Sequence, residues 1–448
     1  MQVPKIIKKQ PMRILLFLIL SNFAIVNGQN TYVLGEGQKS PTVIQDRLEQ
    51  RIFDLAKFGL QENGDTERVA FSDADIEARK WIIETLEALK LNVHIDYAGN
   101  IIGKREGKDP SKKLISFGSH IDRVPNGGNY DGCVGSMASI EVITVLQEQN
   151  ITTNHPLEII IFSNEEGGVM GSRAISGHLT KSAFSVKNST GYSMGEGIMR
   201  LGGDTTKLAQ VIRKKKSMAA FLELHIEQGG ILEQKQLDIG IVEGIVGLKW
   251  WDVTFEGFAN HAGTTPMNAR QDALLAAAKF VVAVNEIANS FNGAQVATVG
   301  RIKAEPGAPN VIPGKVITSL EIRDLSSDII EKVFQTIKER AKAIAQESNV
   351  KISFQLLDTT ANPALTAIPI QKEIKSASKN LKLSYHYMPS GAGHDAQDMA
   401  TIVPTGMIFV PSKGGISHSP KEFTSAKDMA NGANVLLHTI LALDKKLK

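Results

Sequence analysis

Two apolar segments that each run into a polar turn rich in metal-ligating side chains constrain the fold of this chain most strongly. Leu114–Phe117 is strand-like and leads to His120. Leu157–Phe162 is also strand-like and leads to Glu165 and Glu166. In an open α/β sheet, ligands bind outside the carboxyl ends of the strands. The pattern therefore predicts an α/β fold with a metal centre at the strand ends, and it does not suggest a nucleotide site.

The order of the expected elements divides the chain. With 448 residues the chain is too long for one ordinary core, and its 42% hydrophobic and 22% charged residues are typical of a soluble globular protein. A strand–helix–strand unit over 114–163 predicts a mixed, mainly parallel sheet flanked by helices. The order β-α-β-β-α-β over 247–358 predicts an inserted ferredoxin-like α+β domain. The catalytic domain would then comprise 30–246 and 359–448.

The first 28 residues resemble a secretory signal peptide, because basic residues precede the apolar run 14–26, which is too short to span a bilayer. An uncleaved anchor is the alternative, since the cleavage region lacks a clean Ala-x-Ala. We expect an exported protein, periplasmic or secreted, with no membrane contact after cleavage. Cleavage removes four positive charges and no acids, so the net charge falls from +3 to −1. No nucleic-acid partner is therefore expected.

Five histidines lie in turns rich in Gly, Ser or Pro: His120, His225, His261, His394 and His418. A single histidine in such a turn is usually a hydrogen-bonded structural residue. Together with Asp131 and Glu166, however, these histidines offer imidazole and carboxylate ligands suited to zinc, manganese, cobalt or nickel. A carboxylate can bridge two divalent ions at ~3.5–4 Å, and two such ions can activate one shared water.

The adjacent acids Glu165 and Glu166 suggest two roles. Neighbours on an extended chain point to opposite sides, so one would coordinate metal while the other faces the water as a general base. A solvated acidic pair is the alternative. Asp122, two residues after His120, is expected to orient that imidazole. Cys133, the only cysteine, is expected to be a small buried residue where a helix starts.

Seven motifs make the chain resemble the hydantoinase/carbamoylase-type amidases, which include N-carbamoyl-L-amino acid hydrolases, β-ureidopropionases and allantoate amidohydrolases within a wider clan of dinuclear metallopeptidases. They are His-x-Asp at 120, Asp-Gly-x-x-Gly at 131, Glu-Glu-Gly at 165, His-Ile-Glu-Gln-Gly at 225, Asn-His-Ala-Gly-Thr-Thr-Pro-Met at 260, Pro-Asn-Val-Ile-Pro-Gly at 309 and Ser-Gly-Ala-Gly-His-Asp-Ala at 390. They occur in the family's order, and the resemblance covers about residues 41–445.

The resemblance implies two divalent ions per subunit, with zinc preferred and manganese, cobalt or nickel also compatible. His120 and His225 would bind one ion, and Glu166 and His418 would bind the other. Asp131 would bridge the two ions.

The resemblance also implies that Glu165 is the base. Gln228, Asn310 and Arg323 would hold a ureido acid substrate. His261 would reach the partner subunit's active site in a homodimer, contacting substrate and taking part in catalysis.

The sequence leaves the substrate open. An N-carbamoyl-L-amino acid and allantoate both present a ureido group beside a carboxylate, so allantoate hydrolysis is the alternative function. A dipeptidase or aminoacylase is a rival on the same fold, but His225 stands where those relatives usually place a carboxylate. A non-catalytic binding protein is disfavoured, because the base and every expected ligand are present. Some members have an arginine where this chain has Lys249–Trp251, a departure that bears on substrate choice and not on membership of the family.

Overall fold

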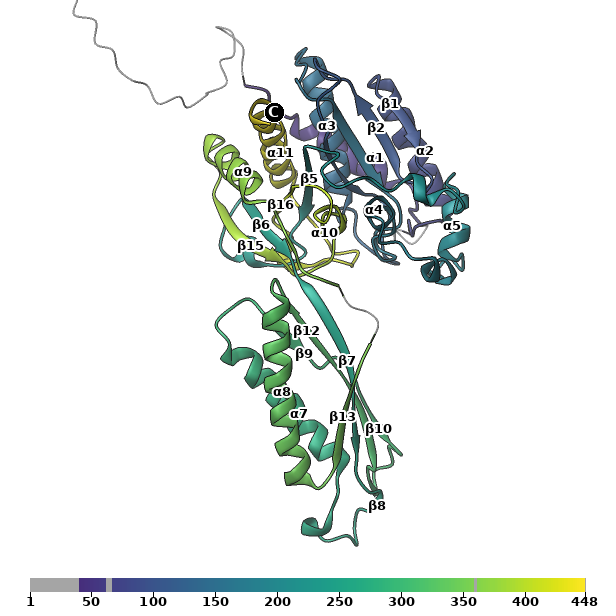
Figure 1. Ribbon diagram of the computed structural model, residues 1–448, viewed down its shortest axis with the longest axis vertical. Coiled ribbons are helices and arrows are strands. Elements are labelled where there is room, and N and C mark those ends of the chain that lie inside the picture. Colours follow the sequence, from purple (N-terminus) through teal and green to yellow (C-terminus); the bar gives the residue numbers. More distant parts are fainter. Residues whose placement is uncertain (1–39, 62–66, 358–360, 448) are drawn as a thin grey trace, which may run out of the picture. The chain divides into compact units, whose positions relative to one another are not determined.

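A nine-stranded mixed sheet dominates the computed structural model, which describes residues 40–61, 67–357 and 361–447 (Figure 1). In pairing order its strands are β1 (Asn92–Ile95), β2 (Ile101–Arg105), β4 (Leu157–Phe162), β3 (Ile115–His120), β5 (Ala220–Ile226), β16 (Thr405–Val410), β6 (Ile239–Ile245) and β14 (Ala364–Leu365), with β15 (Tyr385–Ser390) also paired to β6. The central strands β4, β3, β5 and β16 run parallel. This confirms the predicted mixed sheet with a parallel centre, whereas the signal peptide expected over 1–28 lies outside the described residues.

Helices cover both faces of this sheet because its strands are apolar on both sides. Within β4, Ile159 and Ile161 join the core on one face, while Ile160 and Phe162 join the core on the other. The first core includes α1 (Gln45–Ala56), α2 (Asp73–Ala88), α3 (Cys133–Glu148), α9 (Ile368–Asn380) and α11 (Ala426–Lys446). The second includes α4 (Met170–Ser176) and α10 (Asp395–Met399).

Short helices lie in the connecting segments of the same part of the chain. They are η1 (Lys181–Ser185), α5 (Met194–Arg200), η2 (Leu208–Gln210), α6 (Ile231–Gln234) and η4 (Lys413–Gly415). Helix α1 ends at Ala56, and the chain turns soon after it. Gly59 has φ 89°, and a Cβ there would lie 2.2 Å from the carbonyl oxygen of Glu67. Only glycine accepts that turn without strain.

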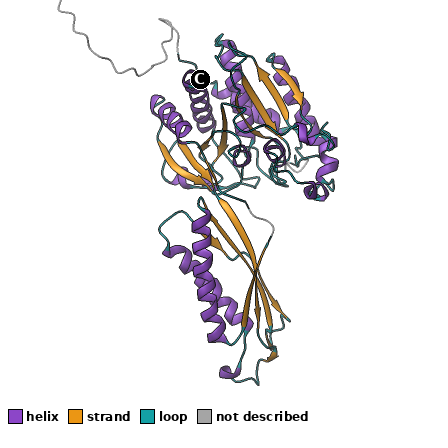
Figure 2. Ribbon diagram, viewed as in Figure 1, coloured by secondary structure: helices purple, strands orange, loops and turns teal. Residues whose placement is uncertain are grey.

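A separate five-stranded antiparallel sheet follows β6. Its order is β10 (Ile302–Glu305), β12 (Lys315–Asp324), β7 (Gly247–Glu256) and β13 (Lys351–Leu356), with β9 (Val296–Thr298) also paired to β12. Helices α7 (Ala273–Ser290) and α8 (Ser327–Ser348) cover one face (Figure 2). The ferredoxin-like order is thereby confirmed, with two short strands, β9 and β10, between α7 and β12.

A two-stranded sheet and a short helix complete this region. They are β8 (Asn260–His261), which pairs with β11 (Val311–Ile312), and η3 (Met267–Ala269). Contacts group residues 41–448 into one unit. The boundaries of the inserted domain at 247 and 358 therefore stay a prediction.

Helix α7 is rich in apolar residues on its exposed side as well as on its buried side. By length and composition alone it could cross a membrane, a test that core helices of soluble proteins also pass. Asp272 caps its first turn by accepting from the amides of Leu274 and Leu275, both at 3.0 Å. Phe280 is buried against the five-stranded sheet, whereas Val282 is 57% exposed.

Candidate metal centre

The carboxyl ends of the parallel strands bring the expected metal ligands together. His120 is the last residue of β3, and the register pairs it with Phe162, the last residue of β4. His225 lies near the end of β5, where Phe409 of β16 is its neighbour. Four segments far apart in sequence therefore deliver their polar side chains to one edge of the sheet, as expected for an α/β fold.

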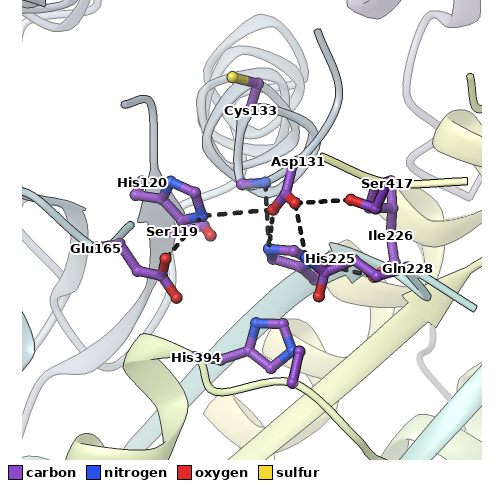
Figure 3. A network of polar contacts seen from close by, with 12 residues as sticks. Ser119, His120, Asp131, Cys133, Glu165, His225, Ile226, Gln228, His394 and Ser417 are labelled. Atoms are coloured by element: carbon purple, nitrogen blue, oxygen red, sulfur yellow. Dashed lines mark hydrogen bonds and ion pairs between the residues drawn. The ribbon is translucent and has the colours of Figure 1, made fainter. Parts of the chain in front are cut away.

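Asp131 belongs to two groups of ligand-type side chains, and Figure 3 shows it beside the first group, His120 and His225. Its Oδ1 lies 3.1 Å from Nε2 of His225 and 3.7 Å from Nε2 of His120. Its Oδ2 lies 3.3 Å from Nε2 of His418, which is itself 3.5 Å from Oε2 of Glu166. The two oxygens of one carboxylate thus face two different ligand sets. This arrangement fits a pair of divalent ions that share Asp131.

The histidine rings are held so that Nε2 faces Asp131. Nδ1 of His120 lies 3.0 Å from the carbonyl oxygen of Asp122, and Nδ1 of His225 lies 2.9 Å from that of Ile226. A carbonyl only accepts, so in the neutral form of each ring Nδ1 carries the proton and Nε2 presents a lone pair. Nε2 of His120 is buried and has no hydrogen-bond partner among the described residues. A metal ion would supply that partner, so the residues present fit the metal.

The electrostatics of the centre favour bound cations. Burial, reinforced by the charge of Glu166, raises the pKa of Glu165 well above its usual range. Burial and Asp131 raise the pKa of Glu166 to about 8. Burial opposes charge on His225, but its hydrogen bond with Asp131 raises its pKa to about 9. Without metal, Glu166 and His225 therefore hold protons at neutral pH. Bound cations would replace these protons in compensating the negative charge of the carboxylates.

Glu165 and Glu166 point to different parts of the centre. Oε2 of Glu165 lies 3.7 Å from Nε2 of His120, whereas Glu166 approaches His418. Asp122 orients His120, as expected, but through its main chain. Its carbonyl, not its carboxylate, makes the 3.0 Å contact with His120, and the carboxylate accepts from the amides of Glu165 and Glu166. The reason is that Nδ1 faces the main chain, which leaves Oδ1 of Asp122 3.7 Å away.

Glu422 does not stand out in the sequence, yet it fixes the backbone that carries Asp131. It is 4% exposed, and its Oε1 accepts from the amides of Tyr130 and Asp131 at 2.8 and 3.0 Å. Its Oε2 accepts from Ser417 at 2.8 Å. No local pattern around Glu422 marks it, because the two amides that it binds lie 292 and 291 residues earlier in the chain. The position next to Asp131 must be glycine, because a Cβ on Gly132 would lie 2.2 Å from Nε2 of His120 and would displace that ring.

His394 lies on the other side of His225. Their ring centroids are 4.4 Å apart, and His394 contributes with Glu223 and His225 to a further buried group of ligand-type atoms. Its Nε2 lies 2.9 Å from Oγ of Ser390, while Nδ1 is buried without a partner among the described residues.

Cys133 is fully buried at the start of α3, as expected.

The expected substrate residues are placed in three locations. Gln228 lies at the centre, where its Nε2 donates to Oδ2 of Asp131 at 2.6 Å. His261 and Asn310 lie beside each other at the two-stranded sheet, because the amide of Ala262 donates to the carbonyl of Asn310. Arg323, near the end of β12, donates from Nη1 to the carbonyl oxygen of Gly391 at 2.7 Å. Gly391 belongs to the segment that leads to His394.

Comparison with known proteins identifies the family. Residues 116–442 match Peptidase family M20/M25/M40. The chain belongs to this family. It is 40% identical over 403 residues to the N-carbamoyl-L-amino acid amidohydrolase of Geobacillus stearothermophilus, covering 89% of this chain and 98% of the relative. It is 38% identical over 408 residues to the ureidoglycolate hydrolase of Arabidopsis thaliana, covering 88% of this chain and 86% of that relative.

A solved structure agrees with these relatives. A hydantoinase/carbamoylase family amidase from Burkholderia multivorans superimposes with a TM-score of 0.85 at 32% identity, covering 92% of this chain and 100% of that one. The resemblance to hydantoinase/carbamoylase-type amidases is thus confirmed, together with the α/β fold class.

Proposed function

We propose that this protein is a dinuclear metal amidohydrolase that hydrolyses a ureido C–N bond of an N-carbamoyl-L-amino acid or a similar ureido acid. The observation that carries the proposal is the placement of Asp131 between two ligand sets, with Glu165 beside the His120 side. The relatives named above act on ureido acids by name, which supports the substrate class. Allantoate, another ureido acid, is the alternative substrate.

The ligands suit two ions of zinc, and manganese, cobalt and nickel are compatible with the same imidazole and carboxylate atoms. When bound, such ions supply Lewis acidity and a lowered pKa for the attacking water. The residues in each set are His120 and His225 on one side, and Glu166 and His418 on the other, with Asp131 shared. In their neutral forms, which bind metal, His120 and His225 both present Nε2 to the centre because Nδ1 is bound to a main-chain carbonyl, and this supports the assignment.

Glu165 moves the proton in the proposed reaction. It takes a proton from the water as the water oxygen bonds to the ureido carbonyl carbon, and it returns the proton to the nitrogen that leaves as the C–N bond breaks. Glu165 is buried beside His120, so its carboxylate is placed to accept that proton and to hold it until it is transferred. Arg323 binds the substrate carboxylate, while Gln228 and Asn310 hold its polar groups.

A homodimer is part of the proposal, and His261 acts in the partner's site. The exposed apolar side chains of α7, including Leu275 at 50% and Val282 at 57%, support a subunit interface. Nδ1 of His261 accepts from the amides of Gly263 and Thr264 at 3.0 and 3.2 Å. The neutral ring therefore carries its proton on Nε2, where it is a donor suited to a developing oxyanion.

Export is proposed from the sequence alone. The basic and then apolar N-terminus supports removal of about residues 1–28 and a periplasmic or secreted location. Mass spectrometry of the protein from its native host would show a mature start near Gln29, and an intact Met1 would contradict export with cleavage.

A substrate panel tests the function. The metal-loaded protein is assayed on several N-carbamoyl-L-amino acids, ureidoglycolate, allantoate and dipeptides. We expect hydrolysis of one or more ureido acids, loss of activity with a chelator and its return with divalent metal. Hydrolysis of dipeptides with no activity on any ureido acid would overturn the proposal.

A further inference from the structure

One row of side chains crosses the five-stranded sheet on the face opposite α7 and α8. Trp251 points toward the helices, where its ring stacks on Phe334 of α8 at 4.2 Å. Its neighbour Trp250 therefore points to the other face. The register places Trp250 opposite Glu321, and Glu321 opposite Thr298. These three residues form one cross-strand row on the face that no helix of this layer covers.

The row borders a cavity of about 350 Å³. Six of its lining residues are Trp250, Thr298, Arg301, Ser319, Glu321 and Leu357. The charged members are already compensated, because Arg301 pairs with Asp252 and Glu321 pairs with Arg323. The indole of Trp250 and the side chain of Leu357 supply apolar surface between them. Nε1 of Trp250 has no hydrogen-bond partner among the described residues, so substitution of this ring breaks no polar contact there.

Glu321 connects this cavity to Arg323. Its two carboxylate oxygens accept from Nε and Nη2 of Arg323 at 2.6 and 3.2 Å. Nη1 of Arg323 donates to Gly391, so three of the five guanidinium N–H groups are used and each Nη nitrogen keeps one. Two residues along one strand lie on the same face at roughly 7 Å. A small acid whose carboxylate binds the free edge of Arg323 therefore has the cavity within reach of its Cα substituent.

We propose that this cavity, the Trp250 pocket, is the subsite for the Cα substituent of the substrate, and that Trp250 makes it select apolar side chains. The inference rests on the proposed function, in which Arg323 binds the carboxylate of a ureido acid. The occupant is apolar because the charges at the rim are paired within the protein and the indole face is the largest ring surface in the lining. An aromatic or branched aliphatic substituent would bury its surface against that ring.

The test compares Trp250→Ala and Trp250→Phe with the unchanged protein on four substrates: the N-carbamoyl derivatives of glycine, L-leucine, L-phenylalanine and L-glutamate. We expect the unchanged protein to prefer the leucine or phenylalanine derivative. Trp250→Ala should lower kcat/KM for these two by roughly 10- to 200-fold, the range that differences in an apolar pocket produce. The glycine derivative should change by less than about twofold, and Trp250→Phe should fall between.

Thr254→Ala is the matched control. Thr254 lies on β7 four residues from Trp250 and on the same face by the strand period, but it does not line the pocket. This variant should leave all four substrates unaffected. Ser319→Phe provides an independent variant, because it fills the pocket instead of emptying it. It should reject the phenylalanine derivative while sparing the glycine derivative, and it keeps the inference testable if Trp250→Ala does not fold.

The outcomes separate the two levels of inference. If the unchanged protein hydrolyses no ureido acid, the proposed function fails. If it hydrolyses them but Trp250→Ala lowers kcat/KM equally for the glycine and phenylalanine derivatives, the Trp250 pocket is not the side-chain subsite. A preference of the unchanged protein for the glutamate derivative would also overturn the apolar assignment.

Discussion

The carboxylate of Asp122 accepts from the backbone amides of Glu165 and Glu166, each at 3.2 Å. Asp122 thereby joins the end of β3 to the turn after β4 and fixes the directions in which the two glutamates leave the main chain. Its carbonyl oxygen also accepts a hydrogen bond from Nδ1 of His120. One residue thus orients His120 and Glu166, a proposed ligand of each metal position, and Glu165, the proposed base.

Asp122→Ala should loosen the turn at Glu165 and Glu166, because both amides lose their acceptor. Loss of such a supporting contact typically costs about 10- to 100-fold in metal affinity or activity. Asp122→Asn keeps one carbonyl acceptor and should be less damaging. Metal titration and kcat for both variants check this. If Asp122→Ala has a metal affinity and a kcat close to those of the unchanged protein, the supporting role of Asp122 is contradicted.

Glu165→Gln should retain both metals yet lose ~10²–10⁴-fold in kcat, because the amide cannot accept the proton. Glu166→Gln is the matched comparison. It should weaken binding of the metal next to His418, because Glu166 contacts that ligand and Glu165 does not. Metal analysis and steady-state kinetics on both variants distinguish base from ligand, and near-normal turnover of Glu165→Gln would refute the assignment.

Metal binding should release protons at neutral pH. The pKa of His225 and of His418 is raised to about 9, the latter by its hydrogen bond with Asp131, and that of Glu166 to about 8. Groups with raised pKa values hold their protons at pH 7 and lose them as the pH rises through those values, whereas coordination needs the deprotonated forms. Metal affinity should therefore increase as the pH rises from neutral through about 9, while the number of released protons falls.

Calorimetric titration in two buffers of different ionisation enthalpy counts these protons. Glu166→Gln removes one titrating group and should release fewer protons at neutral pH than the unchanged protein. A proton count of zero at neutral pH would show that the metal-free centre is already deprotonated.

Arg323→Lys should raise KM for carboxylate-bearing ureido acids by roughly tenfold or more, with both metals retained. A planar guanidinium binds a carboxylate bidentately, which an ammonium cannot, and a hydrogen bond to a charged group is worth about 1.5–3 kcal/mol. Glu321→Gln should act in the same direction but more weakly, because Glu321 orients Arg323. If KM is unchanged in Arg323→Lys, the carboxylate binds elsewhere.

Mixing two inactive variants, His261→Ala and Glu165→Gln, should restore part of the activity when subunits exchange. If His261 serves the partner's site, a heterodimer has one site with both defects and one with neither. Loss of one oxyanion donor costs ~10²–10³-fold in kcat, so the restored site is readily detected. Failure to recover activity after exchange has been demonstrated by mass spectrometry would assign His261 to its own subunit's site.

The sequence alone indicated the parts of this protein whose signals are local. A strand-like run followed by a ligand-rich turn marks its own place in an α/β sheet, so the sequence sufficed to place His120 and Glu165 at strand ends. The order of strands and helices between 247 and 358 likewise predicted the second sheet. Adjacent residues on an extended chain diverge, which predicted separate directions for Glu165 and Glu166.

Only the tertiary structure decided which distant groups meet. Glu422 supports Asp131 from 291 residues further along the chain, the carboxylate of Asp122 binds the turn after the next strand, and Trp250 shares a cavity with Glu321. None of these contacts has a sequence pattern, because each depends on the register of strands and the path of loops, which are set by packing of the whole core. The sequence determined the chemistry available at each strand end, and packing decided which atoms face one another.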